Sequence, residues 1–351
     1  MFGESAGAAS IGHHLTISEH HGQFQQAILQ SGAVNTMPAG RAQIEGQRYF
    51  NHPCNHFGLM DSALSGAQRL EVLRKIPAKE LVKARDRGKV GMFTPTIENV
   101  LIHGDSREWI HNPSRYDPEL KSIMLGDCRE EGQTFVTTLV ARKMKQWSEF
   151  FQRNCPSGLE AEFEAVYGIP ATDKEVARIS SEVVRDYVFL YPIHATSRAL
   201  LARSGVAPVE MNRFHFDRPL KALEKMGLEF LGAHHAAELP FVFGSGSALK
   251  MMTDEEQRLS HQMTEHWILF AWDETSRRFG LSQGMDSLLP SDIGIGGQKQ
   301  EVIVFTENCT VEKGLVERLD SRRLAIWRAT EHWVKEKRAK QYQVFNQSSN
   351  L

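Results

Sequence analysis

A serine, an acidic residue and a histidine occur in this sequence in the types and the order that nucleophilic catalysis needs. Ser5 lies between Gly3 and Gly7 in a G-x-S-x-G cluster. A serine hydroxyl is a weak nucleophile at neutral pH, so it needs a histidine to accept its proton and a carboxylate to orient the imidazole. The candidate acids and then the candidate bases follow along the chain at Asp127, Glu130, Glu131, His234 and His235. These residue types predict a serine nucleophile activated by a general base.

The segments around these candidates have the pattern of an α/β sheet. Small residues after Ser5 favour a helix to about His14 that packs tightly after a sharp turn. Short apolar runs predict buried strands, and the acidic cluster directly follows one of them. The expected strands cover residues 27–29, 122–126, 209–214 and 302–305. Ligands in open α/β sheets bind at such strand ends, and the order serine, acid, histidine is that of α/β-hydrolases, so we expect this fold.

The organisation of the chain predicts one large domain over residues 1–351, because no internal repeat, linker or low-complexity block divides it. A chain of this length can bury a substantial core. Amphipathic patterns predict a helical insertion or cap at 136–205. So few residues precede Ser5 that we expect no strand ahead of the serine turn. The glycine-rich stretch 294–297 is expected to be a loop.

Composition and charge exclude several classes of partner. Lysine and arginine (41) nearly balance aspartate and glutamate (43), for a formal net charge of −2, so no excess charge favours nucleic acid or an anionic membrane. No run approaches the roughly 18 apolar residues of a membrane span. The cysteines lie far apart, outside zinc-binding spacings, and are expected to be free thiols, with disulfides as the alternative. They are Cys54, Cys128, Cys155 and Cys309.

Three segments resemble those of the type-B carboxylesterase and cholinesterase family, and the resemblance covers nearly the whole chain. The stretches FGESAGAASIG and AILQSG are similar to the family's serine segment. The stretch GDCREEGQTF matches its acid segment and puts Glu131, directly before Gly132, at the acid position. The stretch ELPFVFG, in register with its histidine segment, puts His235 rather than His234 at the base position. The resemblance implies an α/β-hydrolase fold.

The resemblance also implies a reaction and a role for each residue. Ser5 would attack a carboxylic ester, His235 would transfer the proton, Glu131 would orient His235, and water would hydrolyse the acyl-enzyme. The backbone N–H of Ala6 would donate to the oxyanion, and no cofactor or metal is implied. Ser31 resembles a position whose hydroxyl supports the catalytic carboxylate, and a strand-end turn serine is the alternative. The substrate would be an ester with an apolar acyl or alcohol part, held partly by the helical region.

The chain departs from the family pattern ahead of the serine segment. The family carries several strands and a glycine-rich HGGG-type loop there, and neither precedes Ser5 in this sequence. We therefore expect an N-terminally truncated carboxylesterase that is impaired or inactive, because one lost oxyanion donor costs about a hundredfold to a thousandfold in turnover. Missing strands would leave an exposed apolar sheet edge, through which we expect the chain to associate with a partner segment.

Two further departures concern single residues. Ala236 follows His235 where the family often has glycine, so a positive φ at this position would strain the loop. Cys54 lacks the nearby second cysteine with which secreted members form a disulfide, and this favours a reducing compartment such as the cytoplasm. The location of the protein is otherwise unknown.

Two other functions compete with ester hydrolysis. A non-catalytic fragment or pseudo-enzyme would act as a binding or interaction module, but relatives of that kind usually lack the serine, and this chain keeps all three residue types of the triad. A metal-binding helical protein would use a group of early histidines, but paired histidines beside a turn are more often a solvated surface. The residues concerned are His13, His14, Glu19, His20 and His21.

Overall fold

The computed structural model describes residues 1–41, 46–60, 63–87, 93–137, 141–272, 301–315 and 321–348. Contacts divide the chain into two compact units. The first unit comprises Met1–Met37 and Arg107–Glu336, and the second comprises Pro38–Ser106 and Lys337–Leu351. The assignment of 1–351 to one domain stays a prediction, and the stretch 294–297 lies outside the described residues.

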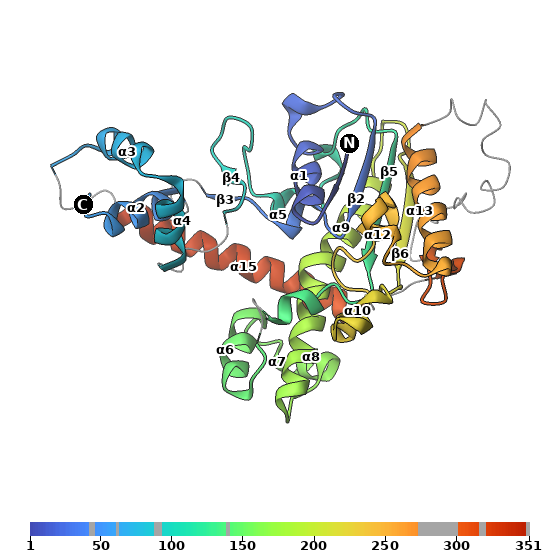
Figure 1. The fold of residues 1–351 in the computed structure, drawn as a ribbon. Helices are drawn as coiled ribbons and strands as arrows, with labels where there is room; N and C mark the ends of the chain where they lie inside the picture. Colours follow the sequence, from blue (N-terminus) through green and yellow to red (C-terminus); the bar gives the residue numbers. More distant parts are fainter. Residues whose placement is uncertain are drawn as a thin grey trace. The chain divides into compact units, whose positions relative to one another are not determined.

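A six-stranded sheet is the main element of the first unit (Figure 1). Its strands lie in the order β1-β2-β5-β6-β7-β8, and each neighbouring pair is parallel except β7 with β8. The strands are β1 Phe2–Glu4, β2 Gln26–Gln30, β5 Ser122–Cys128, β6 Glu210–Phe216, β7 Glu301–Phe305 and β8 Val311–Leu315. The strands predicted from apolar runs are present as β2, β5, β6 and β7, which confirms the α/β class.

A short strand precedes the serine, so the prediction that none would is wrong. The strand β1 pairs with β2 from Phe2 opposite Ile28 to Glu4 opposite Gln30, and the Ser5 amide donates to the Gln30 carbonyl at 2.9 Å. Three residues suffice because the longer β2 lies alongside and supplies the partner groups. The strand β1 is an edge of the sheet, with Phe2 63 % exposed. Association through this edge stays a prediction.

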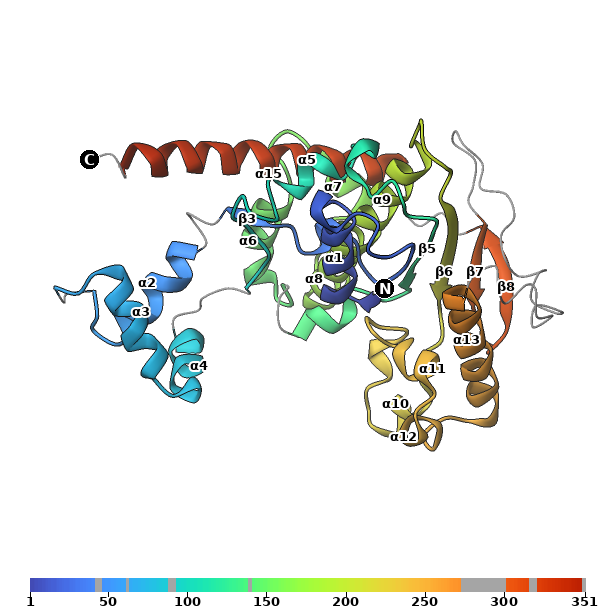
Figure 2. The same ribbon diagram turned by 90° about the horizontal axis from the view of Figure 1, so that it is seen from above.

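Different helices cover the two faces of the sheet (Figure 2). The helices α1 Ala6–His14 and α9 Tyr191–Leu201 pack on one face, and α11 Leu239–Phe243 and α13 Asp254–Trp272 pack on the other. Successive residues of one strand enter opposite cores, as Ala27 and Leu29 pack with α1 and Ile28 packs with α13. Both faces are therefore buried, which explains why the strands are continuous apolar runs rather than alternating patterns.

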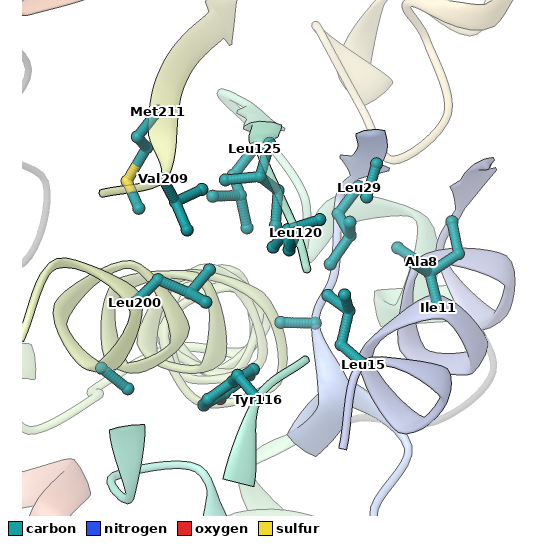
Figure 3. Packing of buried hydrophobic residues seen from close by; sticks show 14 of the residues in the cluster. Ala8, Ile11, Leu15, Leu29, Tyr116, Leu120, Leu125, Leu200, Val209 and Met211 are labelled. Atoms are coloured by element: carbon teal, nitrogen blue, oxygen red, sulfur yellow. The ribbon is translucent and has the colours of Figure 1, made fainter. Parts of the chain in front are cut away.

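The core on the α1 side is shown from close by in Figure 3. Ile11 of α1 and Leu200 of α9 pack against Leu29 of β2 and Leu125 of β5. Leu29 and Leu125 are fully buried. Burying a side chain of this size contributes about 1.5–3 kcal/mol. The strands that end at the predicted site residues are thus anchored in a packed interior.

Helices fill the segment between β5 and β6, where the sequence predicts an insertion at 136–205. They are α6 Met144–Asn154, α7 Glu160–Tyr167, α8 Asp173–Val184, η6 Arg185–Leu190 and α9. The helix α8 begins with a capping box between Thr172 and Glu175, and η6 has π-helical geometry. Phe163 and Ile179 of these helices share a core with Trp327 of α15, which spans Ser321–Ser348.

The second unit contains short strands and helices of its own. They are β3 Gly40–Arg41, β4 Thr96–Ile97, α2 Gln47–His56, α3 Gly66–Lys75 and α4 Ala78–Arg87. Further short elements of the chain are η1 Ser18–His20, η2 Val34–Thr36, α5 Ser106–Trp109, η4 Pro113–Arg115, η5 Gln133–Thr137, α10 Ala222–Lys225, η7 Glu229–Leu231 and α12 Gly246–Leu249. Among the described residues, no helix has the length and apolar character needed to cross a membrane.

Candidate active site

Ser5 lies at a sharp turn between β1 and α1. Its φ of 56° and ψ of −116° are outside the regions that most residues adopt. The surrounding backbone is crowded, which explains the nearby glycines. A Cβ added to Gly3 would lie 2.6 Å from the carbonyl carbon of Gly7, and one added to Gly32 would lie 3.0 Å from the carbonyl oxygen of Ser5. The turn places Ser5 directly at the carboxyl end of β1, as a nucleophile elbow requires.

Ser5, His235 and Glu131 form a continuous chain of hydrogen bonds. Ser5 Oγ lies 2.7 Å from His235 Nε2, and His235 Nδ1 lies 2.6 Å from Glu131 Oε2. With its proton on Nδ1, the imidazole donates to Glu131 and accepts from the Ser5 hydroxyl. Glu131 is fully buried, and its Oε1 accepts a hydrogen bond from the Cys128 amide at 2.7 Å. Three segments far apart in the sequence thus bring these side chains together.

The other two candidate acids have different partners. Asp127 Oδ1 lies 2.8 Å from Nδ1 of His215 on β6, and both side chains are buried. Glu130 Oε2 accepts a hydrogen bond from the Ala233 amide at 3.0 Å, and the Glu130 amide donates to the Ala233 carbonyl at 2.9 Å. Glu130 therefore ties the acid loop to the histidine loop, a role that its place in a run of acidic residues does not indicate.

The two adjacent histidines also differ in their contacts. Nδ1 of His234 lies 3.1 Å from the carbonyl oxygen of its neighbour Gly232. His235 is the one of the pair that contacts Ser5 directly. Ala236 follows with a φ of 70°, in the left-handed region that favours glycine. The strain expected for alanine at this position is therefore present in the loop.

Position 132, directly after Glu131, requires glycine because a helix approaches it closely. A Cβ added to Gly132 would lie 1.9 Å from the carbonyl oxygen of Ser181 in α8, a distance that no side chain tolerates. The helix α8 therefore packs directly on the loop that carries Glu131. This contact gives a steric reason for the glycine that follows the acid in the sequence.

Glu4, the residue before the serine, lies close to the same imidazole. Glu4 Oε1 is 3.2 Å from His235 Nε2 and makes no hydrogen bond within the described part of the chain. Burial raises the pKa of Glu4 to about 7; His235 opposes this rise, and the charges of Glu238 and Glu131 add to it. Burial lowers the pKa of His235, but the hydrogen bond and charge of Glu131, with the charges of Glu4 and Glu238, outweigh it and raise that pKa. These carboxylates stabilise an imidazolium.

Glu238 connects the histidine loop to the sheet through buried polar contacts. Its Oε1 accepts a hydrogen bond from Gln30 Nε2 at 2.9 Å, and its Oε2 accepts one from Cys128 Sγ at 3.1 Å. Trp267 Nε1 in turn donates to Gln30 Oε1 at 3.0 Å. Burial raises the pKa of Glu238. Its place in ELPFVFG, close after His235, is the sequence signal that could have identified it.

Two phenylalanines pack on the imidazole of His235. The ring centroid of Phe135 in η5 lies 5.3 Å from that of His235, and the centroid of Phe189 in η6 lies 4.6 Å from it. The two phenyl rings stack with centroids 5.6 Å apart. Phe189 is 1 % exposed, whereas Phe135 is partly exposed. They form an apolar wall beside the His235 imidazole.

Ala6 and Ser31 are the remaining predicted site residues. Ala6 begins α1, and its amide precedes the first helical hydrogen bond, from the Ala9 amide to the Ser5 carbonyl at 3.0 Å. Amides at this point have no partner within the helix. Ser31 is fully buried with a φ of 53°, and its Oγ has no hydrogen-bond partner among the described residues. Support of Glu131 by a direct hydrogen bond from Ser31 is therefore not observed.

The early histidines make contacts that need no metal. Nδ1 of His14 lies 2.8 Å from Nδ1 of His20, and Nε2 of His13 lies 3.0 Å from the carbonyl oxygen of Met37. Across the described ranges, no group of three or more His, Cys, Asp or Glu side chains is placed to hold a metal ion. The cysteines are all free thiols.

Comparison with known proteins connects this geometry to one family. The model described as the carboxylesterase family matches residues 1–309. The para-nitrobenzyl esterase of Bacillus subtilis (strain 168) is 28 % identical over 290 residues, covering 77 % of this chain and 52 % of that protein. An inactive carboxylesterase-like protein of Byssochlamys spectabilis is 25 % identical over 301 residues, covering 77 % and 50 %. The acetylcholinesterase of Bungarus fasciatus is 27 % identical over 305 residues, covering 77 % and 46 %. The chain spans about half the length of these curated relatives.

Solved structures give the same answer for the fold. A PNB esterase superposes with a TM-score of 0.64 at 22 % identity, covering 93 % of this chain and 61 % of that one. A thermophilic PNB esterase superposes with a TM-score of 0.64 at 21 % identity, covering 93 % and 62 %. The predicted α/β-hydrolase fold is confirmed by these likenesses. Because the family model matches most of its length, the chain belongs to the carboxylesterase family.

Proposed function

We propose that this chain is a carboxylic ester hydrolase that acts through an acyl-enzyme on Ser5. The observation that carries the proposal is the hydrogen-bond chain from Ser5 Oγ to His235 Nε2 at 2.7 Å and from His235 Nδ1 to Glu131 Oε2 at 2.6 Å. The names of the relatives, esterases of two kinds, support a carboxylic ester as the class of substrate.

In the proposed reaction, His235 Nε2 takes the hydroxyl proton of Ser5 as Oγ attacks the ester carbonyl carbon. Glu131 accepts the Nδ1 proton in a hydrogen bond and stabilises the imidazolium. His235 then gives its proton to the leaving alcohol, and a water molecule, deprotonated in the same way, attacks the acyl-enzyme and releases the acid. The Ala6 amide, at the positive end of α1, donates to the oxyanion.

We expect turnover by this chain to be low. Ala6 is the oxyanion donor that we assign among the described residues, and each missing donor costs about a hundredfold to a thousandfold. Phosphonylation of the serine by a fluorophosphonate needs only one chemical step, in which Oγ attacks phosphorus and fluoride leaves. It therefore reports on the nucleophile even where repeated turnover is slow.

The apolar wall beside the base points to the shape of the substrate. Phe135 is partly exposed and stacks on Phe189, so its free surface is placed to contact an apolar acyl or alcohol group. Phe189 comes from the helical region between β5 and β6. This supports a role for that region in holding the ester.

A non-catalytic interaction module is the competing proposal. It is favoured by one relative whose name describes it as an inactive carboxylesterase-like protein. The close contacts of Ser5 and Glu131 with His235 favour catalysis instead.

Intact-mass labelling of the chain with a fluorophosphonate separates the two proposals. The variants are Ser5→Ala and, as a matched control, Ser10→Ala, which removes an exposed hydroxyl from α1, the helix that follows Ser5. We expect one adduct per chain in the unmodified protein and in Ser10→Ala, and none in Ser5→Ala. Absence of label in the folded unmodified protein, or label that persists in Ser5→Ala, would overturn the catalytic proposal and favour the interaction module.

A further inference from the structure

The helical run that follows the acid loop changes its geometry next to the general base. The helices α8 and α9 continue into one another through η6, six residues with π-helical geometry. A π-helical turn inserts an extra residue into an α-helix and rotates the side chains that follow it, and such turns are frequent at functional sites. The question is which side chain this turn redirects.

The side chain at this turn that contacts the candidate site is Phe189. Its ring lies 4.6 Å from the imidazole of His235, tilted by 41°, and it is 1 % exposed. Phe135 lies against the same two rings. A ring packed at this distance restricts rotation of the imidazole and excludes water from one side of it.

Buried ionic contacts fix the turn that carries Phe189. Asp186 is fully buried and accepts hydrogen bonds from the Tyr167 hydroxyl at 2.7 Å and from Arg323 Nη1 at 2.6 Å. Arg185 Nε donates to the second carboxylate oxygen at 2.8 Å. These contacts tie η6 to α7 and α15, so the position of Phe189 is set by packing far from the serine.

The same helical run also reaches the acid loop. The Ser181 carbonyl of α8 lies where a Cβ on Gly132 would be, directly beside Glu131. One rigid element therefore contacts both the loop of the acid and the ring of the base. Steric contacts of this element therefore restrict the positions of Glu131 and His235, in addition to the hydrogen bond between them.

We propose that Phe189, presented by the π-helical turn η6, is a positioning residue for the general base: it holds the His235 ring between Glu131 and Ser5 and keeps water from that ring. The proposal rests on the proposed function, since it assigns His235 as the base. It goes beyond that function by giving the helical region between β5 and β6 a part in catalysis in addition to holding the ester.

The test compares Phe189→Leu and Phe189→Ala with Phe150→Leu. Phe150 is a buried phenylalanine of α6 that packs on Trp147 of the same helix, so its replacement removes a similar apolar volume from the same helical region. The readouts are titration of the His235 ring by NMR and the rate of fluorophosphonate labelling as a function of pH. The milder leucine variant provides a folded protein if the alanine variant does not fold.

We expect both Phe189 variants to titrate His235 at higher pH than the unmodified protein. Water that enters would relieve the burial that lowers the His235 pKa, while the surrounding carboxylates of Glu131, Glu4 and Glu238 continue to raise it. The acidic limb of the labelling profile would shift to higher pH together with the His235 pKa. Labelling on the plateau should fall about tenfold to a hundredfold, the cost of a displaced catalytic group. Phe150→Leu should change neither readout.

Equal titration midpoints and plateau rates in Phe189→Leu and Phe150→Leu would refute the positioning role and leave Phe189 as core packing. The NMR titration needs no reaction, so the two proposals fail separately. If the unmodified protein takes no label while Phe189→Leu still shifts the His235 titration, the proposed function fails and the positioning of His235 by Phe189 stands.

Discussion

The two sides of the candidate site are held in place by very different amounts of structure. The serine turn follows β1, an edge strand of three residues that pairs only with β2 among the described strands. The acid and histidine loops are held by the Glu130 contacts with Ala233, by α8 against Gly132 and by η6 against His235. The loops of Glu131 and His235 are thus joined by several contacts between distant segments, whereas the turn of Ser5 is held by the short pairing of β1 with β2 and by the packing of α1.

This difference indicates which substitutions are expected to change the reactivity of Ser5. A closely packed environment cannot absorb an added atom, so we expect a substitution that adds an atom on the acid and histidine side to displace Glu131 or His235. Three substitutions perturb Glu131 and His235 in different ways. Gly132→Ala inserts an atom beside Glu131, Glu4→Gln removes a charge beside His235, and Ala236→Gly relieves backbone strain.

The largest effect is expected for Gly132→Ala. The added Cβ would lie 1.9 Å from the Ser181 carbonyl oxygen, so the acid loop or α8 must move. Overpacking of this kind costs about 1–3 kcal/mol of stability, and a displacement of about 1 Å at the carboxylate costs about a hundredfold in rate. We expect fluorophosphonate labelling of Ser5 to slow by about that factor.

Gly66→Ala is the matched control for this prediction. A Cβ at Gly66, in the first turn of α3, would meet no atom within 4 Å, so this variant should label like the unmodified protein. Thermal unfolding of both variants shows whether Gly132→Ala is folded when it is assayed. A folded Gly132→Ala protein that labels at the unmodified rate would show that the acid loop is not fixed by α8.

An intermediate effect is expected for Glu4→Gln. The charge of Glu4 contributes to the raised pKa of His235, so its removal lowers that pKa. The base then stays neutral, and competent to accept a proton, at lower pH. The acidic limb of the labelling profile should therefore shift to lower pH. The pKa of Glu4 is itself about 7, so the shift reflects a charge that is only partly present in the unmodified protein near neutral pH.

Glu224→Gln removes an exposed carboxylate on α10 and should leave the labelling profile unchanged. Labelling at several pH values in the three proteins checks the prediction. An acidic limb that moves to higher pH in Glu4→Gln would contradict the assigned electrostatics.

Much of the fold could be predicted from the sequence because its signals are local. The buried strands are apolar runs, and the serine, acid and histidine segments carry motifs that place Ser5, Glu131 and His235 in register. The strand β1 could not be predicted in this way. Its residues have no strand pattern of their own, and its backbone is ordered by hydrogen bonds to β2, which lies about twenty residues further along the chain.

The parts of the site that the sequence did not indicate depend on contacts between distant segments. Glu130 looks like one of several surface carboxylates until Ala233 is placed beside it. The π-helical turn has the composition of an ordinary amphipathic helix. Asp186 of this turn accepts a hydrogen bond from Arg323 of the distant α15, so a pattern within the helix could not predict that Phe189 lies on His235.

The smallest effect is expected for Ala236→Gly. Ala236 has a φ of 70°, and an alanine in the left-handed region costs about 1–2 kcal/mol relative to its preferred conformations. Glycine removes that cost but loses more backbone entropy on folding, so we expect the free energy of unfolding to rise by about 1 kcal/mol at most. Ala237→Gly, at a neighbouring buried alanine with no positive φ, should have the opposite sign, because it removes a packed methyl group and relieves no strain. Chemical denaturation of the two variants measures both changes.

Since the contacts of Glu131 and Phe189 with His235 hold the histidine loop independently of Ala236, labelling of Ser5 in Ala236→Gly should stay at the unmodified rate. A stabilised variant that labels more slowly would instead mean that the strained backbone, and not the packing around it, sets the position of the base.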